Sequence, residues 1–381
     1  MKKKLSILIY SLDNGGAERV VSILLNGLID KYNITLVLMN NIINYELPQN
    51  IEIHYLEQSE PSENGLMKFL KLPFLGFKYK LFCKKKNIDI SLSFMNRPNY
   101  INILSKIFGT KTKILISERI APTMEYQTNS LKDFISRKLI SNLYNKANLI
   151  IPNAHGITLD LIQLGIKESL IKVINNPVDV DKIQKLKNEK VTIDYDKFTF
   201  ITVGRLHPQK NHKLLLECIK IFDANLVIIG DGALQNDLKE SIKKDKLEKK
   251  VFLLGKKSNP FSYISKANIF ILGSNYEGFP NVLLEALACG IPIISTDCKS
   301  GPREILSPNS DVNFQLKDNI ELAEYGILTP VQNIEKFQEA MKLLINDKAL
   351  RENYQKKAKK RSNDFDVSKI IKEYEEVLCA V

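Results

Sequence analysis

The residues NIFILGSNYEGFPNVLLEALACGIPIIST (268–296) hold the pattern that decides the fold of this chain. NIFILG (268–273) and IPIIST (291–296) are short apolar runs rich in β-branched residues, as in buried strands. Between them an apolar helical pattern covers 281–289, and Gly290 follows as a C-terminal stop. A helix between two such runs predicts a βαβ unit whose strands are parallel.

The alternation of short apolar runs and helical patterns extends beyond this unit. In the same half of the chain, strands are predicted at FTFITVG (198–204), LVIIG (226–230) and VFLLG (251–255). The first half repeats the pattern less regularly, with strands predicted at LSILIY (5–10), ITLVLM (34–39), IEIHYL (51–56), DISLSF (89–94), KILISE (113–118) and LIIPN (149–153). We therefore predict an α/β fold with two doubly wound, Rossmann-like domains.

The connection between the domains is expected near VINNPVDVDKI (173–183), where Asn-Asn-Pro breaks the periodicity. A chain of 381 residues is also too long for one comfortable core. We expect an N-terminal domain over 1–178, a C-terminal domain over 179–363 and a last helical segment over 364–381.

The charge of the chain is strongly basic, and the excess lies mainly in the first half. The net charge is +12; residues 1–180 carry 23 basic and 15 acidic side chains, and residues 181–381 carry 32 and 28. This bias favours an anionic partner, which could be a nucleic acid, a membrane surface or a phosphorylated ligand. No nucleic-acid-binding motif is present, so nucleic acid is the poorest of the three.

Cysteine usage and the first residues indicate a cytoplasmic protein. The five cysteines include no C-x-x-C pair, which favours reduced thiols, and the four scattered histidines predict no metal site. MKKKLSILIYSL (1–12) imitates a signal peptide but lacks a small-x-small cleavage site, so a first buried strand explains it better. No run reaches the roughly 20 apolar residues of a membrane span.

Polar residues follow the predicted strands of the C-terminal half, where ligands bind in open α/β sheets. Arg205 and Lys210 come after 198–204, and Glu277 follows 268–273 directly before a helix start. Helix-start amides, the helix dipole and two fixed cations attract anions, so we predict a phosphate site here. The alternative is that both cations are ordinary solvated side chains.

Two glutamates stand eight residues apart in the opening segment. Glu285 lies inside the apolar helix, where its carboxylate can accept hydrogen bonds from a vicinal diol such as that of ribose. Glu277 precedes the helix, where a polyhydroxylated sugar would suit it. The alternative is that each glutamate is an ordinary negative charge near the start of a helix, which stabilises the helix by about 0.3–1 kcal/mol. This alternative explains Glu277 better than Glu285.

Three motifs together carry a family resemblance. GRLHPQKN (204–211), GDG (230–232) and EGFPNVLLE (277–285) resemble the retaining GT-B glycosyltransferases of the family-4 type. The resemblance covers essentially the whole chain. It implies two Rossmann-like domains facing a cleft, a nucleotide-sugar donor on the C-terminal domain, no cofactor or obligatory metal, and a last helix that crosses back to the N-terminal domain.

The resemblance also assigns residues. It implies that Arg205 and Lys210 hold the donor diphosphate, that Glu285 holds the ribose, and that Glu277 holds the donor sugar. The expected donor-binding residues are Gly15, Gly16, Gly204, Arg205, Lys210, Gly230, Gly232, Glu277, Gly278, Phe279, Pro280, Asn281, Val282 and Glu285, of which Arg205, Lys210 and Glu277 are expected to be catalytic. For Gly15 and Gly16, a tight turn that merely needs glycine is the alternative.

The segment MKFLKLPFLGFKYKLFCKKKN (67–87) has seven lysines, five aromatic residues and no acid. It predicts a helix on an anionic membrane surface or on a lipid pyrophosphate, with an ordinary surface helix as the alternative. The expected acceptor or membrane residues are Lys68, Lys71, Lys78, Lys80, Lys84, Lys85, Lys86 and Arg119. Members of the family often have a histidine near Glu118, so Glu118 and Arg119 are kept as cleft candidates.

Stretches such as IYSLDNGGAERVV (9–21) and NRPNYINIL (96–104) resemble the branch of the family that extends lipid-linked saccharides in bacterial protein N-glycosylation. This resemblance implies transfer of GalNAc from UDP-GalNAc, in an α-1,4 linkage, to diacetylbacillosamine on undecaprenyl diphosphate. It also implies a peripheral protein on the inner face of the plasma membrane. A transferase for lipopolysaccharide or capsule, a UDP-sugar epimerase and a non-catalytic UDP-sugar-binding scaffold are the alternatives.

Overall fold

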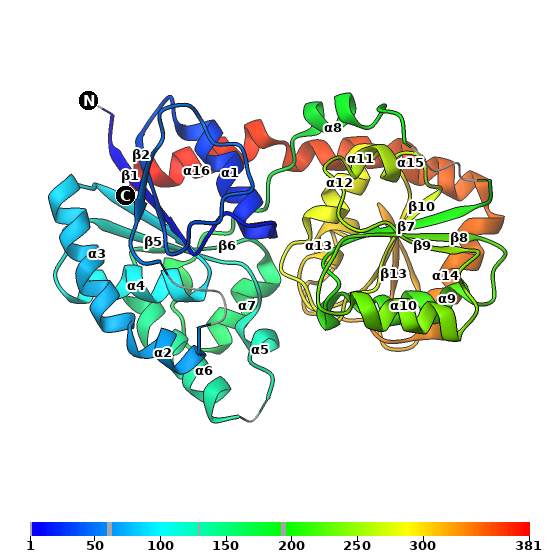
Figure 1. The fold of residues 1–381 in the computed structure, drawn as a ribbon, viewed down its shortest axis with the longest axis horizontal. Coiled ribbons are helices and arrows are strands. Elements are labelled where there is room, and N and C mark those ends of the chain that lie inside the picture. The colour runs from blue at the N-terminus through cyan, green and yellow to red at the C-terminus, as the bar shows by residue number, and fades with distance from the viewer. Residues whose placement is uncertain (1, 59–62, 129, 192–195) are drawn as a thin grey trace. The chain divides into compact units, whose positions relative to one another are not determined.

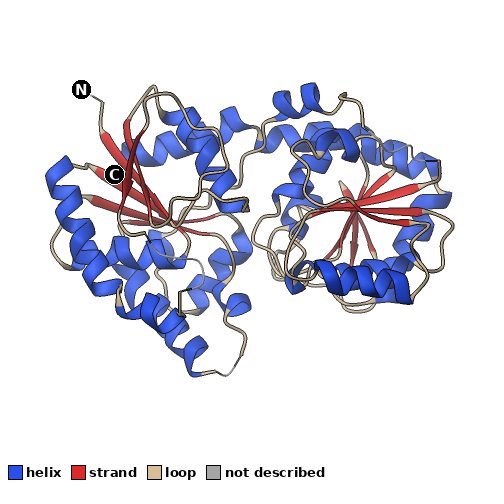
Figure 2. Ribbon diagram, in the orientation of Figure 1, coloured by secondary structure: helices blue, strands red, loops and turns tan. Residues whose placement is uncertain are grey.

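The structure is a computed structural model that describes residues 2–58, 63–128, 130–191 and 196–381. The chain divides into two compact units (Figure 1). The N-terminal unit comprises Met1–Pro177 together with Val367–Val381, and the C-terminal unit comprises Val178–Asp366. Each unit has one central sheet with helices on both faces (Figure 2).

The sheet of the N-terminal unit is parallel throughout, in the order β3-β2-β1-β4-β5-β6. Its strands are β1 (Lys4–Ile9), β2 (Asn33–Leu38), β3 (Glu52–Tyr55), β4 (Ile90–Phe94), β5 (Lys113–Glu118) and β6 (Leu149–Pro152). Every strand predicted in this half is present. The strand order reverses between β1 and β4, and such a switch point is where doubly wound folds bind ligands at the carboxyl edge.

The helices of the N-terminal unit are α1 (Gly16–Leu28), α2 (Gly65–Leu70), α3 (Leu72–Lys86), α4 (Asn96–Ile107), α5 (Pro122–Glu125), α6 (Leu131–Leu143), α7 (His155–Gln163) and α16 (Val367–Ala380). The C-terminal helix α16 packs on α1, and its Tyr374 and Leu378 belong to the same apolar core as Val20 and Val21. Gly27 makes this contact possible, because a Cβ there would lie 2.4 Å from Cδ1 of Ile371.

The sheet of the C-terminal unit has the order β12-β13-β11-β10-β7-β8-β9. Its strands are β7 (Thr199–Val203), β8 (Asn225–Ile229), β9 (Val251–Leu253), β10 (Ile269–Leu272), β11 (Ile293–Thr296), β12 (Glu321–Ala323) and β13 (Gly326–Thr329). The strands predicted in this half are all found. The sequence did not predict the antiparallel pair β12–β13, because strands of three and four residues carry almost no periodicity.

The helices of the C-terminal unit are α8 (Val180–Leu186), α9 (His212–Ile219), α10 (Gln235–Lys244), α11 (Phe261–Ile264), α12 (Asn281–Cys289), α13 (Pro302–Leu306), α14 (Ile334–Asn346) and α15 (Lys348–Ser362). Helix α12 has the predicted bounds, and Gly290 caps it in the left-handed conformation at φ 82°. No helix among the described residues is long and apolar enough to span a bilayer.

Candidate functional site

The carboxyl edge of the C-terminal sheet brings Lys210 and Glu277 together. Lys210 follows β7 and Glu277 follows β10, and these strands are neighbours in the sheet. The Lys210 ammonium lies 2.6 Å from Oε1 of Glu277, and the Ser274 hydroxyl donates to the same oxygen at 2.6 Å. Because the side chains of Lys210 and Glu277 are only 17% and 6% exposed, the pair is well shielded from water.

The loops that carry this pair are tied together through their backbones. The Asn275 amide donates to the Gln209 carbonyl at 2.8 Å, and Nε2 of Gln209 donates to the Tyr276 carbonyl at 2.9 Å. Nδ2 of Asn275 also donates to the Pro208 carbonyl at 3.0 Å. These bonds fix 208–210 against 274–277, so the ion pair stands on a rigid support.

Gly230 and Gly232 have a packing role that is visible in the backbone. Both have positive φ, at 144° and 150°. A Cβ on Gly230 would lie 1.9 Å from the Gly204 carbonyl oxygen, and one on Gly232 would lie 2.6 Å from the Leu206 carbonyl oxygen. These glycines therefore let β8 and its following turn approach the loop that leads to Lys210.

The start of α12 is buried and supported from behind. Gly278, Phe279 and Pro280 are buried, and Asn281 and Val282 are half-buried. Ser300 donates to the Glu277 carbonyl at 3.2 Å. Gly301, at φ 79°, packs so closely that a Cβ would lie 2.4 Å from the Gly278 carbonyl oxygen. Ser274, Ser300 and Gly301 were not predicted, since single small residues carry no motif of their own.

Glu285 lies inside α12 and is 3% exposed. Arg205, in contrast, is an exposed side chain at the end of β7. Of the predicted cations, only Lys210 makes a described ion pair with a glutamate of the motif. That Arg205 binds the same anion as Lys210 remains a prediction.

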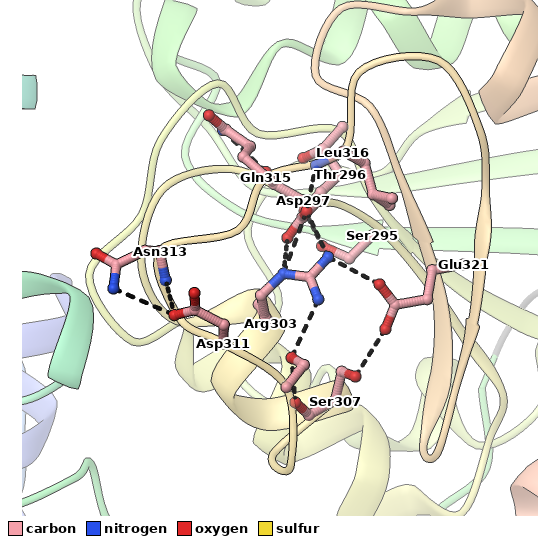
Figure 3. A network of polar contacts seen from close by, with 11 residues as sticks. Ser295, Thr296, Asp297, Arg303, Ser307, Asp311, Asn313, Gln315, Leu316 and Glu321 are labelled. Atoms are coloured by element: carbon pink, nitrogen blue, oxygen red, sulfur yellow. Dashed lines mark hydrogen bonds and ion pairs between the residues drawn. The ribbon is translucent and has the colours of Figure 1, made fainter.

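A second network braces the segment that supports α12 (Figure 3). Arg303 on α13 is 4% exposed, and its guanidinium binds Asp297 through Nε at 3.1 Å and Nη2 at 2.7 Å. Nη2 also donates to Glu321 at 2.8 Å, and the Arg303 guanidinium lies 5.0 Å from the Phe314 ring centre. The Leu316 amide also donates a hydrogen bond to the Asp297 carboxylate at 2.8 Å. Arg303 comes two residues after Gly301, so this network fixes the turn that packs against Gly278 at the start of α12.

His212, at the start of α9, is buried and has no hydrogen-bond partner for either ring nitrogen among the described residues. Burial, followed by the positive charge of Lys210, lowers its pKa to about 4. His212 is therefore neutral near pH 7. It adds no positive charge beside Lys210.

Gly15 lies at the carboxyl edge of the N-terminal sheet, between β1 and α1, and Gly16 is the first residue of α1. Gly15 precedes α1 with φ −92°, an ordinary extended conformation. A Cβ there would lie 2.0 Å from the Glu18 carboxylate, so the side chain of Glu18 folds back over this turn. A glycine at position 15 therefore leaves room for the Glu18 side chain. A left-handed backbone is not the reason for it.

The structure does not support a surface role for Arg119. Its side chain is 6% exposed, donates to Ser117 at 3.2 Å and to Asn176, and lies 5.7 Å from the Phe94 ring centre. The prediction that Arg119 faces a membrane surface is corrected, because its guanidinium is enclosed between the strand ends of β4 and β5. A role of Arg119 toward the acceptor stays a prediction. No pattern in the neighbouring sequence indicates this burial.

Glu118 is also buried, at the end of β5. It accepts hydrogen bonds from the Tyr144 hydroxyl at 2.7 Å and from the Arg119 amide at 3.0 Å. Burial, followed by the negative charge of Glu125, raises the pKa of Glu118 to about 8. Glu118 therefore keeps its proton in much of the neutral range.

The lysine-rich helices α2 and α3 have both paired and exposed cations. Lys71 forms ion pairs with Glu57 and Glu63, Lys86 pairs with Glu52, and Lys78 donates to the Leu56 carbonyl at 2.5 Å. Lys84 and Lys85 are exposed, and Lys68 and Lys80 are partly exposed. The sequence overestimated the number of unpaired lysines, because their acidic partners Glu52, Glu57 and Glu63 lie outside the segment 67–87.

Only part of the aromatic content of this segment is exposed. Tyr79 and Phe82 belong to the interior, at 0% and 7% exposure. Phe69, Phe74 and Phe77 remain exposed, at 41%, 69% and 46%. Helix α3 therefore packs on α4 with one face and presents phenylalanines on another.

Within the described residues, no group of three or more His, Cys, Asp or Glu side chains could hold a metal ion. The charged groups that the structure gathers at the C-terminal edge are Lys210 and Glu277. They could bind a polar, anionic ligand through charge and hydrogen bonding.

Comparison with known proteins gives relatives over the whole chain. The family model for glycosyl transferases group 1 matches residues 183–361. The chain is 41% identical, over 97% of its length and 98% of the relative, to N-acetylgalactosamine-N,N'-diacetylbacillosaminyl-diphospho-undecaprenol 4-alpha-N-acetylgalactosaminyltransferase of Campylobacter jejuni. It is 26% identical, over 99% of both chains, to a second C. jejuni protein named GalNAc-alpha-(1->4)-GalNAc-alpha-(1->3)-diNAcBac-PP-undecaprenol alpha-1,4-N-acetyl-D-galactosaminyltransferase.

A solved structure supports the fold. The Anabaena protein HepE, in complex with UDP and glucose, superposes with a TM-score of 0.80 at 19% identity and 100% coverage of both chains. The 41% identity over nearly the full length extends the relationship beyond the residues of the family model. The chain therefore belongs to the group 1 glycosyl transferases, as a glycosyltransferase with the GT-B fold.

Proposed function

We propose that this glycosyltransferase moves GalNAc from UDP-GalNAc to a saccharide on undecaprenyl diphosphate, in an α-1,4 linkage and with retention of the anomeric configuration. The names of both Campylobacter relatives contain the same transferred sugar and an acceptor linked to undecaprenol through a diphosphate. The shielded pair of Lys210 and Glu277, joined over 2.6 Å at the sheet edge, is the observation in this chain that carries the proposal.

The proposed acceptor is one sugar longer than the sequence led us to expect. Diacetylbacillosamine alone was expected on the lipid diphosphate. The name of the relative at 41% identity has a GalNAc already attached to diacetylbacillosamine. We therefore propose GalNAc-diacetylbacillosamine on undecaprenyl diphosphate as the acceptor, with transfer to O4 of its GalNAc.

The chemistry proposed for the site is electrostatic stabilisation of the leaving group. When the bond between the anomeric carbon and the donor phosphate breaks, negative charge develops on the UDP diphosphate. Lys210, held in place by Glu277, supplies a fixed positive charge for it, as do the amides at the start of α12. Because the support is rigid, little reorganisation is needed during the reaction. Glu277 is proposed to bind the donor sugar and Glu285 the ribose.

The test compares donors and acceptors in one assay. The purified full chain is incubated with radiolabelled UDP-GalNAc or UDP-GlcNAc, together with undecaprenyl-diphosphate acceptors that carry diacetylbacillosamine or GalNAc-diacetylbacillosamine. Preferred transfer of GalNAc to the longer acceptor, with an α-1,4 product by NMR, is expected. Transfer of another sugar, or only to lipopolysaccharide or capsule acceptors, would favour the alternative transferase. Membership of the family sets aside the epimerase and the non-catalytic scaffold.

A cytoplasmic, peripheral location at an anionic membrane fits this acceptor. The exposed phenylalanines of α2 and α3 and the exposed Lys84 and Lys85 suit the boundary between acyl chains and anionic head groups. Co-sedimentation with phosphatidylglycerol vesicles at low salt, lost with neutral phosphatidylcholine, is the expected result. Equal binding to both would reject the electrostatic contribution.

A further inference from the structure

One carboxylate in the N-terminal unit holds two cations from different elements. Glu57, two residues beyond β3, lies 2.9 Å from Nη2 of Arg97 and 3.2 Å from Nζ of Lys71. Lys71 is the residue between α2 and α3, and Arg97 is the second residue of α4. Glu57 therefore fixes a guanidinium and an ammonium close to one another.

The guanidinium of Arg97 is shielded but short of hydrogen-bond acceptors. Nε, Nη1 and Nη2 are inaccessible to solvent and have no hydrogen-bond partner among the described residues, and the contact of Nη2 with Glu57 is an ion pair without hydrogen-bond geometry. The Arg97 side chain is 15% exposed. A buried charged donor without an acceptor is unfavourable and rare in folded proteins, so such a group indicates a missing acceptor.

This cation pair lies at the switch point of the sheet. Arg97 follows β4 and Tyr10 follows β1, which are the neighbouring strands where the order reverses. Lys68 of α2 approaches the same place, because its ammonium lies 5.5 Å from the Tyr10 ring centre. Lys68, Lys71 and Arg97 thus lie beside residues that follow β1, β3 and β4, at the edge where a doubly wound sheet binds its ligand.

Helices α2 and α6 carry exposed apolar side chains. Leu66 and Leu70 of α2 are 64% and 62% exposed, and Leu131 and Phe134 of α6 are 75% and 60% exposed. Both helices lie at the same end of the N-terminal unit in Figure 1. An apolar surface beside a cationic centre matches a ligand with an anionic head and an apolar chain.

Hydrogen bonds at the start of α4 tie the segment before α6 to the same centre. Asn96 donates to Glu125 at 2.9 Å and to the Tyr126 hydroxyl at 2.6 Å, and Arg137 of α6 donates to the Tyr126 carbonyl at 2.9 Å. Arg97, the next residue along α4, contacts Glu57. The consecutive residues Asn96 and Arg97 therefore anchor the segments that lead to α6 and α2.

We infer that Arg97 and Lys71, oriented by Glu57, bind the diphosphate of a lipid whose apolar chain lies against the exposed leucines of α2. A guanidinium matches phosphate oxygens through two parallel hydrogen bonds, and an ammonium adds a point charge. The diphosphate supplies the acceptors that Arg97 lacks and competes with Glu63 for Lys71. This inference rests on the proposed function, since it places the diphosphate of the lipid-linked acceptor in this chain.

A bulk anionic membrane does not meet the same requirement. Lys84 and Lys85, at the other end of α3, are exposed and accept any anionic head group by charge alone. The donors of Arg97 are shielded, so an anionic group must reach into the site and offer several oxygens. A diphosphate does this better than a single phosphodiester.

The experiment measures binding to vesicles and needs no donor and no transfer. Full-length protein is titrated with neutral phosphatidylcholine vesicles that contain undecaprenyl diphosphate, undecaprenyl monophosphate or phosphatidylglycerol at matched charge, and with inorganic pyrophosphate. Arg97→Gln should weaken binding to the diphosphate vesicles by about 10-fold or more, Lys71→Gln by less, and Arg97→Lys by an intermediate factor. Binding to phosphatidylglycerol should change less than twofold.

Controls separate this site from the donor site and from a folding defect. Lys111→Gln removes an exposed charge just before β5, at the opposite edge of the sheet, and should behave like wild type. UDP binding and the thermal midpoint should be unchanged in Arg97→Lys. If both Arg97 variants bind the diphosphate vesicles as tightly as wild type does, the inference is overturned. If pyrophosphate in solution binds as tightly as the lipid diphosphate, the part of the inference that places the apolar chain on α2 is overturned. A failure to transfer GalNAc leaves this binding result intact, so the two proposals fail separately.

Discussion

The carboxyl edges of the two sheets are built in different ways. In the C-terminal unit, Lys210 and Glu277 stand on loops that are tied to each other by backbone hydrogen bonds. In the N-terminal unit, side-chain hydrogen bonds connect elements that are far apart in the sequence. This network starts within the strands, where Tyr79 of α3 bonds to Ser6 of β1 at 2.8 Å and to Ser91 of β4 at 2.6 Å.

This polar network continues through α4 to the end of β5. Ser91 donates to Asn102 at 2.8 Å, and Asn102 donates to Ser93 at 3.1 Å. The Tyr144 hydroxyl then links Asn99, at 3.4 Å, to Glu118, at 2.7 Å. The C-terminal edge thus depends on loop motifs that can be read from the sequence, whereas the N-terminal edge depends on isolated polar residues. The family model, which matches 183–361, falls wholly within the C-terminal unit.

The largest effect is expected from Gly230→Ala in the C-terminal unit. The new Cβ would lie 1.9 Å from a backbone oxygen of Gly204, and φ of 144° is strained for any L side chain. We expect a loss of more than about 4 kcal/mol in the free energy of unfolding, or no folded C-terminal unit, because a backbone atom must move. Thermal unfolding and UDP binding measure this.

Gly290→Ala is the matched control for this substitution. Gly290 has φ 82°, but a Cβ there would meet no atom within 4 Å. Only the left-handed conformation is penalised, at about 1–2 kcal/mol. Similar losses in the two variants would show that conformational strain, and not the close approach of the loops, limits Gly230.

The next effect is expected from Lys210→Ala. Without the ammonium, the leaving diphosphate loses a fixed charge and Glu277 loses its partner, so kcat should fall by about 10²- to 10³-fold. Lys213→Ala, an exposed lysine of α9, is the control and should leave turnover unchanged. An unchanged kcat/KM for Lys210→Ala would reject the role of this lysine in leaving-group stabilisation.

The sequence predicted the parallel strands and α12 because buried strands and an apolar helix that ends at a glycine have strong local patterns. It did not predict β12–β13, whose strands are too short to show a period. It also assigned Tyr79 and Phe82 to a membrane-facing segment, although both lie in the interior. Composition counts residues in a segment, and it does not tell which face of a helix they occupy.

The candidate site shows the same limit. Lys210 and Glu277 could be named because each follows a strand within a recognisable motif. Arg97 and Glu57 could not, because their partnership joins residues 40 positions apart and neither belongs to a motif. Arg119 was misplaced because nothing in its immediate sequence reveals that Asn176 and Phe94 enclose it.

Asn102→Ala tests whether the N-terminal edge depends on its side-chain network. Asn102 donates to the Leu115 carbonyl at 3.1 Å and accepts from Ser91 at 2.8 Å, all in the interior. Removing the amide leaves these groups unsatisfied, so we expect a loss of about 2–3 kcal/mol in the free energy of unfolding. Asn33→Ala, at an exposed position, should cost less than about 0.5 kcal/mol. Equal costs would mean that the network contributes no stability.

The smallest effect concerns Glu118 and depends on pH. Burial raises its pKa from 4.5 to about 8, so the folded protein keeps a proton that the unfolded chain has already lost between these values. The resulting stability is complete below about pH 4.5 and is lost as the pH rises towards about 8. Glu118→Gln removes this dependence. The free energy of unfolding of the variant, minus that of wild type, should therefore increase from pH 5 to pH 7, by about 1–2 kcal/mol.

In the Glu118→Gln variant, the neighbouring Glu125 still makes the free energy of unfolding depend on pH. Burial also raises the pKa of Glu125, so Glu118→Gln should retain a weaker slope of the same sign. The double variant with Glu125→Gln should be flatter still, as measured by urea unfolding at each pH. Parallel curves for wild type and Glu118→Gln would mean that burial does not raise the pKa of Glu118. The carboxylate at the end of β5 would then be more open to water than the shielded pair of Lys210 and Glu277 at the C-terminal edge.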